Sequence, residues 1–262
     1  MRNQRRGMCL IFNIQKFESL CPRYGGEVDA ENLKRCFGAL SFEVIVFKDY
    51  TAFEIFDTLR KVAQADHSDE DCFVCCILTH GGATPDGNEY LYGSEGRFSY
   101  NRLYDPFKDD VCPTLRGKPK LFFIQACRGT KLDNGVKLKK GYNMADHNNH
   151  SMVTNPDFLL AISTVPGYFS FRNTVDGSHF ITNLCAIIEK GLRNKKEELE
   201  LMNILRQLNR KMAYDFQSNV PNDKKWSGKK QMPCFITTLT KQLVFPHNIS
   251  TPSEVRFISR SR

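Results

Sequence analysis

Short apolar runs alternate with segments of helical periodicity along the first half of the chain. Four runs have the length and the β-branched and aromatic content of buried strands: residues 8–14, 42–47, 72–79 and 120–125. Between them, residues 29–40 repeat apolar side chains at helical spacing, and Thr51 and Glu54 form the pair typical of a capping box that begins a helix. Strands that alternate with helices predict an α/β domain with a mainly parallel sheet.

A change of composition separates this half from the rest. Residues 130–156 are rich in Asn, Gly, Lys and His and lack apolar periodicity, so we interpret them as an exposed, cleavable linker. Residues 157–163 and 234–239 are then predicted as strands, the second being the last strand of the chain, and the basic segment 246–262 as a disordered tail. Two helices are predicted between these strands, with the apolar faces Ile181, Leu184, Cys185, Ile188 and Leu192, and Leu201, Leu205, Leu208 and Met212.

The charge of the chain is unevenly placed. Of the 262 residues, which are enough to bury a substantial core, residues 1–146 carry 21 basic and 20 acidic side chains, whereas residues 147–262 carry 16 and 9. The net charge of +8 therefore favours an acidic partner, without choosing among nucleic acid, a membrane surface and acidic substrates. The sequence has no apolar run near the roughly 20 residues that a membrane-spanning helix needs. Its start is basic, but we recognise no export signal after it.

The ten cysteines do not form a disulfide pattern. Several lie within apolar runs, which favours reduced thiols in a cytoplasmic protein over the scaffold of a small secreted domain. Cys72 and Cys75 have the spacing of a metal or redox pair, but no second pair with zinc spacing accompanies them, so we interpret both as core thiols. We predict no metal and no cofactor.

Two residues that can carry chemistry follow directly after predicted buried strands. His80 follows the run 72–79 and Cys127 the run 120–125, and open α/β sheets build their sites at such carboxyl ends. An imidazole can take the thiol proton and later return it to a leaving amine, which is the chemistry of acyl transfer to cysteine. The backbone amides of Gly81 and Cys127 are candidates for an oxyanion hole.

Five ordered motifs give the chain its family resemblance. They are Gln125-Ala126-Cys127-Arg128-Gly129, Thr79-His80-Gly81, Gly117-Lys118-Pro119-Lys120, Ser163-Thr164-Val165-Pro166-Gly167 followed by Ser170-Phe171-Arg172-Asn173, and Lys230-Gln231-Met232-Pro233-Cys234. From about residue 6 to residue 245 the sequence resembles a caspase. The resemblance implies an endopeptidase that cleaves after aspartate. It also implies a caspase-like fold, in which helices flank a mostly parallel six-stranded sheet that extends across a dimer.

The resemblance also implies roles for individual residues. Cys127 is the nucleophile and His80 the acid and base, with the Gly81 amide in the oxyanion hole. The aspartate at the cleavage site, P1, is bound by Arg23, Gln125 and Arg172, and the substrate backbone by Ser170 and Arg172. Phe169 and Phe171 line the S2 side, and Asn173 lies near S4. Because Phe171 and His179 stand where tryptophan is common in the family, the P4 preference stays open, as does the role of the long segment 82–93.

The linker suggests how such an enzyme is activated. Residues 1–146 would form a large subunit region and residues 147–262 a small one, with cleavage after Asp146, which we prefer, or Asp133. About six residues precede the family core, which favours an executioner of apoptosis without an adaptor-binding prodomain. Expected partners are protein substrates, a second copy of the chain, an upstream activating caspase and inhibitor-of-apoptosis proteins, but no nucleic acid and no membrane.

Two alternatives are kept open. One is a non-catalytic regulatory caspase homologue, which conflicts with the presence of His80, Cys127, Arg23, Gln125 and Arg172 together. The other is a basic nucleic-acid-binding protein, which rests on charge alone and lacks a recognisable binding fold.

Overall fold

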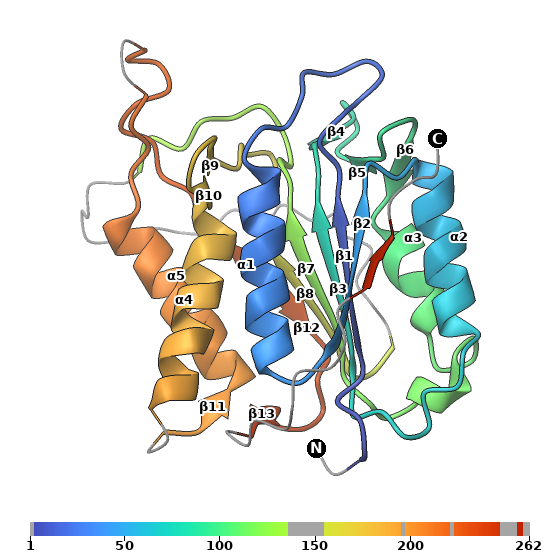
Figure 1. Ribbon diagram of the computed structural model, residues 1–262. Helices are drawn as coiled ribbons and strands as arrows, with labels where there is room; N and C mark the ends of the chain where they lie inside the picture. The colour runs from blue at the N-terminus through green and yellow to red at the C-terminus, as the bar shows by residue number, and fades with distance from the viewer. Residues whose placement is uncertain (1–2, 136–154, 195–196, 221–222, 247–255, 259–262) are drawn as a thin grey trace.

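A seven-stranded sheet forms the centre of the computed structural model, which describes residues 3–135, 155–194, 197–220, 223–246 and 256–258 (Figure 1). In spatial order the strands are β12 (Cys234–Thr237), β8 (Phe158–Ile162), β7 (Lys120–Gln125), β3 (Phe73–Leu78), β1 (Met8–Asn13), β2 (Glu43–Lys48) and β14 (Arg256–Ile258). Only β12 is antiparallel to its neighbour. The expected caspase-like, mostly parallel six-stranded sheet flanked by helices is confirmed, and β14 adds a seventh strand.

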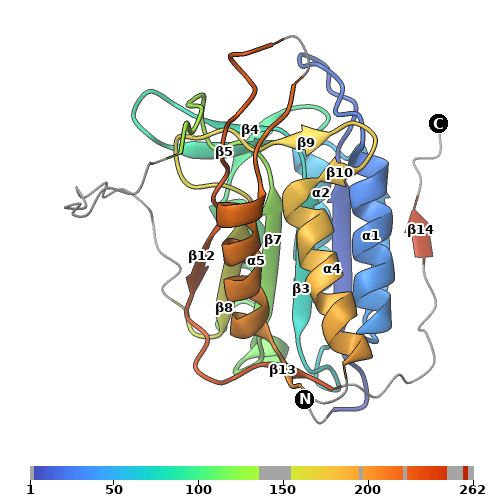
Figure 2. The same cartoon turned by 90° about the vertical axis from the view of Figure 1, so that its left-hand side faces the viewer.

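Helices cover both faces of the sheet (Figures 1 and 2). One face carries α1 (Gly26–Ala39), α4 (His179–Arg193) and α5 (Leu201–Asp215), and the other carries α2 (Ala52–Ala63) and α3 (Asn101–Tyr104), with 3-10 turns at Asp105–Phe107 and Pro113–Leu115. A separate apolar cluster fills each of the two layers. Because both faces are covered, β3, β7 and β8 are buried at every residue, which is why they read as unbroken apolar runs in the sequence.

Local signals fix the ends and faces of the helices. The capping box at the start of α2 is present: Glu54 N donates to Thr51 Oγ1 (3.2 Å), and Thr51 N donates to Glu54 Oε2 (2.8 Å). Helix α4 buries Ile181, Leu184 and Cys185, as its apolar spacing predicts. Among the described residues, no helix is long and apolar enough to cross a bilayer, and all ten cysteines are free thiols.

Three small antiparallel sheets complete the fold. The long segment 82–93, whose role the sequence leaves open, contributes to a sheet of β4 (Gly81–Ala83), β5 (Glu89–Tyr92) and β6 (Arg97–Ser99). The pair β9 (Arg172–Asn173) and β10 (Gly177–Ser178) lies near the start of α4, and β11 (Leu199–Glu200) pairs with β13 (Val244–Phe245).

The prediction that residues 234–239 form the last strand is wrong, and so is the prediction of a wholly disordered tail. Strands β13 and β14 both follow β12, and β14 pairs in parallel with β2, where the edge of the sheet offers backbone donors and acceptors. Strands of two or three residues are too short to leave a period in the sequence. The tail residues 247–255 and 259–262 lie outside the described residues.

The predicted linker is only partly described. Its first residues are held by isolated bridges, Lys131 with Tyr168 and Asp133 with Lys230. Residues 136–154 lie outside the described part of the chain.

Candidate active site

Strands β3 and β7 bring His80 and Cys127 to the same edge of the sheet. These strands are parallel neighbours, with Leu78 opposite Gln125, so two residues further on His80 is level with Cys127. Both residues line a cleft of about 690 Å³ together with Gly81 and Gly129. The sequence predicted that both residues follow buried strands at one edge of the sheet, and this register places them there.

The backbone sets the protonation of His80. Its Nε2 lies 3.0 Å from the carbonyl oxygen of Cys21, which can only accept, so Nε2 carries the hydrogen and Nδ1 of the neutral ring is free to take a proton. The ring also packs on Phe17, with centroids 4.6 Å apart. Burial lowers the pKa of His80, and the charges of Arg172 and Arg23 lower it further, so the imidazole is kept in its basic form.

The Cys127 thiol lies against the backbone of Ser170. Ser170 N donates to Sγ at 3.4 Å, and Sγ–H donates to Ser170 O at 3.7 Å. Burial raises the pKa of Cys127, and the Ser170 amide and the charges of Arg172 and Arg23 oppose that rise. Cys127 therefore rests as a thiol, which would need a base to become a thiolate.

Gly81 stands close to Cys127 for a steric reason. A Cβ atom at this position would lie 2.5 Å from Cys127 O and 3.2 Å from Ala126 Cβ. Only glycine lets the β4 backbone approach the residue that follows β7 so closely.

Arg23 is a buried cation, 1% exposed, with an unused donor. Its backbone N–H donates to Gln15 O (2.8 Å), and its Nη2 pairs with Asp29 Oδ2 at 3.2 Å. Its Nη1 has no hydrogen-bond partner in the described part of the chain. Burial and the neighbouring charge of Arg172 lower the pKa of Arg23 to about 10. A buried guanidinium with a free donor is prepared to meet an anion.

Gln125 and Arg172, the other two residues expected to bind the P1 aspartate, are each held by a hydrogen bond. Gln125 Nε2 donates to Ser170 Oγ at 2.8 Å, while Gln125 Oε1 is buried without a partner in the described structure. Arg172 Nε donates to Tyr24 O at 2.6 Å. Tyr24 directly follows Arg23, and Ser170 also contacts Cys127 Sγ, so these hydrogen bonds bring Gln125 and Arg172 to the same region as Arg23 and the thiol.

Asp29 is a functional residue that sequence reasoning missed. It is fully buried in α1, and its carboxylate accepts from Ser178 N (2.6 Å), Ser178 Oγ (3.1 Å) and Arg23 Nη2. It therefore orients Arg23 and ties α1 to the residue that caps α4. An acid in the first turn of a helix is common, so the sequence offers no signal that separates Asp29 from a capping acid.

The segment 169–173 is held by Gln231, which lies in one of the family motifs but had no predicted role. Phe171 N donates to Gln231 Oε1 (2.6 Å), and Gln231 Nε2 donates to Ser163 O (2.7 Å). Asn173, expected near S4, uses its side-chain oxygen to accept from the amides of Val175 and Asp176, which closes its own turn.

Aromatic rings from distant parts of the chain gather beside this segment. Trp226 packs against Phe169 and Phe171, with centroids 4.8 and 6.4 Å apart. Phe216 packs against Phe171 (5.8 Å) and His179 (4.6 Å). We call these five side chains the aromatic cluster. Phe169 and Phe171 were expected on the S2 side, whereas the position of Trp226 could not be read from its loop.

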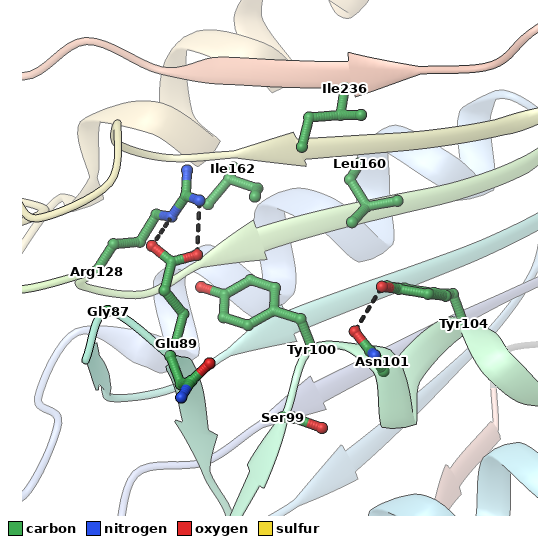
Figure 3. Close-up of a pocket in the computed structure, with 11 residues that line it drawn as sticks. Gly87, Glu89, Ser99, Tyr100, Asn101, Tyr104, Arg128, Leu160, Ile162 and Ile236 are labelled. Atoms are coloured by element: carbon green, nitrogen blue, oxygen red, sulfur yellow. Dashed lines mark hydrogen bonds and ion pairs between the residues drawn. The ribbon is translucent and has the colours of Figure 1, made fainter. Parts of the chain in front are cut away.

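The hairpin 82–93 supports Arg128, the residue after Cys127. Arg128 is 2% exposed and pairs with both carboxylate oxygens of Glu89 on β5, Nε to Oε1 at 2.7 Å and Nη2 to Oε2 at 2.6 Å (Figure 3). It also donates to Thr164 O (3.2 Å). Glu89, Arg128 and the buried Tyr100 line a cavity of about 350 Å³. The bidentate pair joins β5 to the loop that follows β7 and contains Cys127.

The structure describes only one of the two candidate cleavage residues, Asp133. Asp133 is half-buried, and its carbonyl oxygen accepts from Lys230 N at 2.8 Å. Asp146 lies outside the described residues.

Comparisons with known proteins agree with this arrangement. Residues 6–244 match the caspase domain as a family. Caspase-1 of Spodoptera frugiperda is 40% identical over 248 residues, which cover 94% of this chain and 80% of that protein. Caspase drICE of Drosophila melanogaster is 39% identical over 258 residues, which cover 97% of this chain and 74% of that protein. The crystal structure of caspase-1 from Spodoptera frugiperda matches with a TM-score of 0.80, 41% identity and 93% coverage of both chains. The chain thus belongs to the caspase family of cysteine proteases.

Proposed function

We propose that the protein is an endopeptidase that cleaves proteins after aspartate, with Cys127 as nucleophile and His80 as acid and base. The observation that carries the proposal is the buried Arg23, whose Nη1 has no hydrogen-bond partner among the described residues. Cys21 and Tyr24, which lie close to it in the sequence, accept from His80 Nε2 and Arg172 Nε. A non-catalytic homologue would have no need of a neutral histidine whose Nε2–H is fixed by Cys21.

The reaction begins when Cys127 Sγ attacks the scissile carbonyl carbon and the thiol proton passes to His80 Nδ1. The carbonyl oxygen becomes an anion, to which the Gly81 and Cys127 amide N–H groups would donate hydrogen bonds. As the C–N bond breaks, His80 returns the proton to the leaving amine and a thioester remains on Cys127. Water, deprotonated by His80, then hydrolyses the thioester and restores the thiol.

P1 recognition follows from charge and hydrogen-bond geometry. Two guanidinium groups, Arg23 and Arg172, meet one carboxylate, whereas a neutral P1 residue leaves the buried Nη1 of Arg23 without an anionic acceptor. If the Gln125 amide turns by 180°, its Oε1 accepts from Ser170 Oγ and its Nε2 becomes a third donor. Glutamate is one methylene too long for a site fixed by Asp29 and Tyr24.

Substrate residues before P1 would add a strand beside 170–172 and place apolar side chains on the aromatic cluster. We further propose an executioner role in apoptosis, synthesis as a zymogen and activation by a cut in the linker. We prefer Asp146 over Asp133, because the carbonyl oxygen of Asp133 already accepts a hydrogen bond from Lys230 N. The enzyme would act in the cytoplasm as a dimer, with an upstream caspase and inhibitor-of-apoptosis proteins as partners.

A series of fluorogenic peptides that differ only in P1 tests the proposal. On the linker-cleaved protein, we expect kcat/KM for Asp to exceed that for Asn by roughly 10⁴-fold, because the neutral analogue leaves charged donors unpaired. Replacing Arg172 by Lys should lower kcat/KM for Asp by about tenfold or more, since one charged hydrogen bond is lost. Equal cleavage after Asp and Asn would refute aspartate specificity, and an unchanged value in Arg172→Lys would remove Arg172 from the P1 site.

The electrostatics of His80 can be tested by titration. In the Cys127→Ser protein, we expect the NMR pKa of His80 to lie below that of a free imidazole, because burial and two nearby cations disfavour its charged form. Activity should therefore persist to a lower pH than the titration of free imidazole allows. Replacing Arg172 by Gln removes one cation and should raise the pKa of His80. A pKa that does not move would show that Arg172 and His80 are not coupled.

A further inference from the structure

Helices α4 and α5 lie side by side on the side of the molecule that faces the viewer in Figure 2, and a groove lies between them. The groove has a volume of about 610 Å³ and is lined by Ala186, Ile187, Lys190, Arg193, Gln207, Arg210, Lys211, Tyr214 and Asp215. On each helix these residues recur at intervals of three or four, so each helix presents one continuous wall. We call this surface the α4–α5 groove.

The groove concentrates positive charge on its two walls. Lys190, Arg193, Arg210 and Lys211 are all exposed, and within the described residues none of them takes part in a salt bridge. Among the described residues of the lining, Asp215 is the single acidic one. Four cations around one groove create a local positive potential that attracts an anionic ligand.

The groove also offers apolar contact. Ile187 is half-buried and packs on the core below, and Ala186 and the aromatic ring of Tyr214, 75% exposed, lie in the same lining. A surface that combines cations with exposed apolar atoms suits a polypeptide, whose acidic side chains can meet the cations while its aliphatic parts cover the apolar lining.

One end of the groove is continuous in sequence with the proposed substrate cleft. Phe216 directly follows Tyr214 and Asp215, and it packs against Phe171 and His179 of the aromatic cluster. His179 begins α4, and Ala186 follows seven residues later, which is about 10 Å along the helix. A substrate that passes the aromatic cluster can therefore reach the groove within a few more residues.

We propose that the α4–α5 groove is an exosite that binds an acidic segment of protein substrates, located before the residues that occupy the cleft. The proposal rests on the protease function proposed above. Continuity with the cleft and the apolar lining favour a peptide over a nucleic acid, whose phosphates would use the cations alone.

Three peptide substrates would test the exosite. All carry the same cleavable sequence ending in aspartate: one is a tetrapeptide, one adds an N-terminal leader of Glu and Ala through a spacer of about five residues, and one has Gln in place of each Glu. For the wild type, we expect the acidic leader to raise kcat/KM about fivefold over the Gln leader through a lower KM, and this advantage to shrink as salt rises.

Two matched double variants test whether the advantage of the acidic leader depends on the cations of the groove. Arg210→Gln/Lys211→Gln removes two groove cations, and Arg206→Gln/Lys241→Gln removes two exposed cations outside the lining, one of them on the same helix. The groove variant should lose the advantage of the acidic leader while it cleaves the tetrapeptide as the wild type does. The control variant should keep the advantage.

The outcomes separate the exosite from the protease function. Failure to cleave the tetrapeptide would overturn the protease function, and binding of the labelled Glu leader to the Cys127→Ala protein, followed by anisotropy, would still report on the groove. Equal kcat/KM for the two leaders, or an advantage that survives in the groove variant, overturns the exosite. Tighter groove-dependent binding of a single-stranded RNA than of the Glu leader would assign the groove to nucleic acid instead.

Discussion

Replacing Cys127 by alanine is expected to lower kcat/KM for a peptide ending in aspartate by roughly 10⁴-fold or more, because acyl transfer loses its nucleophile. Cys127 is the residue after β7 whose Sγ lies against Ser170, and alanine removes only this atom from the cleft. Stability should change little, since the thiol makes weak hydrogen bonds. The measurement is steady-state hydrolysis of a fluorogenic peptide, with thermal unfolding recorded on the same samples.

Cys21 provides the matched control. It is an exposed thiol that lines the same cleft, and it contacts His80 through its backbone carbonyl oxygen, which accepts from Nε2. Cys21→Ala keeps that carbonyl, so its kcat/KM should stay within about twofold of wild type, the change expected where no charged or catalytic contact is lost. If Cys21→Ala were inactive and Cys127→Ala active, the nucleophile would be misassigned.

Replacing Glu89 by glutamine is expected to destabilise the protein by about 3–5 kcal/mol, because it leaves the charge of Arg128 buried without its counter-ion. The pair is bidentate, with Arg128 2% exposed. Activity should fall as well, since Arg128 follows the nucleophile directly. Denaturant unfolding followed by fluorescence would measure the change in the free energy of unfolding.

Two further variants make this test specific. Glu95→Gln removes an exposed acid from the β5–β6 connection and should leave the unfolding free energy within about 0.5 kcal/mol of wild type. Glu89→Leu/Arg128→Met removes both charges and should recover most of the lost stability, because no unpaired ion remains. A Glu89→Gln protein as stable as Glu95→Gln would show that the buried pair contributes nothing.

The sequence was most informative where a pattern is local and repeated. Strands β3 and β7 are buried on both faces, so their apolar runs marked both the strands and the residues that follow them. Thr51 and Glu54 interact over three residues, which is why the start of α2 could be predicted.

Contacts between distant segments left no such pattern. Asp29 meets Ser178, 149 residues away, and Gln231 meets Phe171, 60 residues away. The residues around Glu89 are mostly polar and gave no sign of a buried ion pair, because the partner of Glu89, Arg128, lies 39 residues further along the chain. Family resemblance supplied Arg23 and Arg172 as site residues, but the buried carboxylate that orients Arg23 became evident only from the packing of α1 against α4.

The pairing of β7 with β8 has a consequence for folding after linker cleavage. Lys120 to Ile124 pair in register with Phe158 to Ile162, and both apolar clusters draw side chains from either side of residues 136–154. A cut within that segment therefore divides every layer of the core between two polypeptides. Refolding of the cleaved protein becomes a reaction between two molecules, so its apparent stability rises with protein concentration, whereas that of the uncut chain does not.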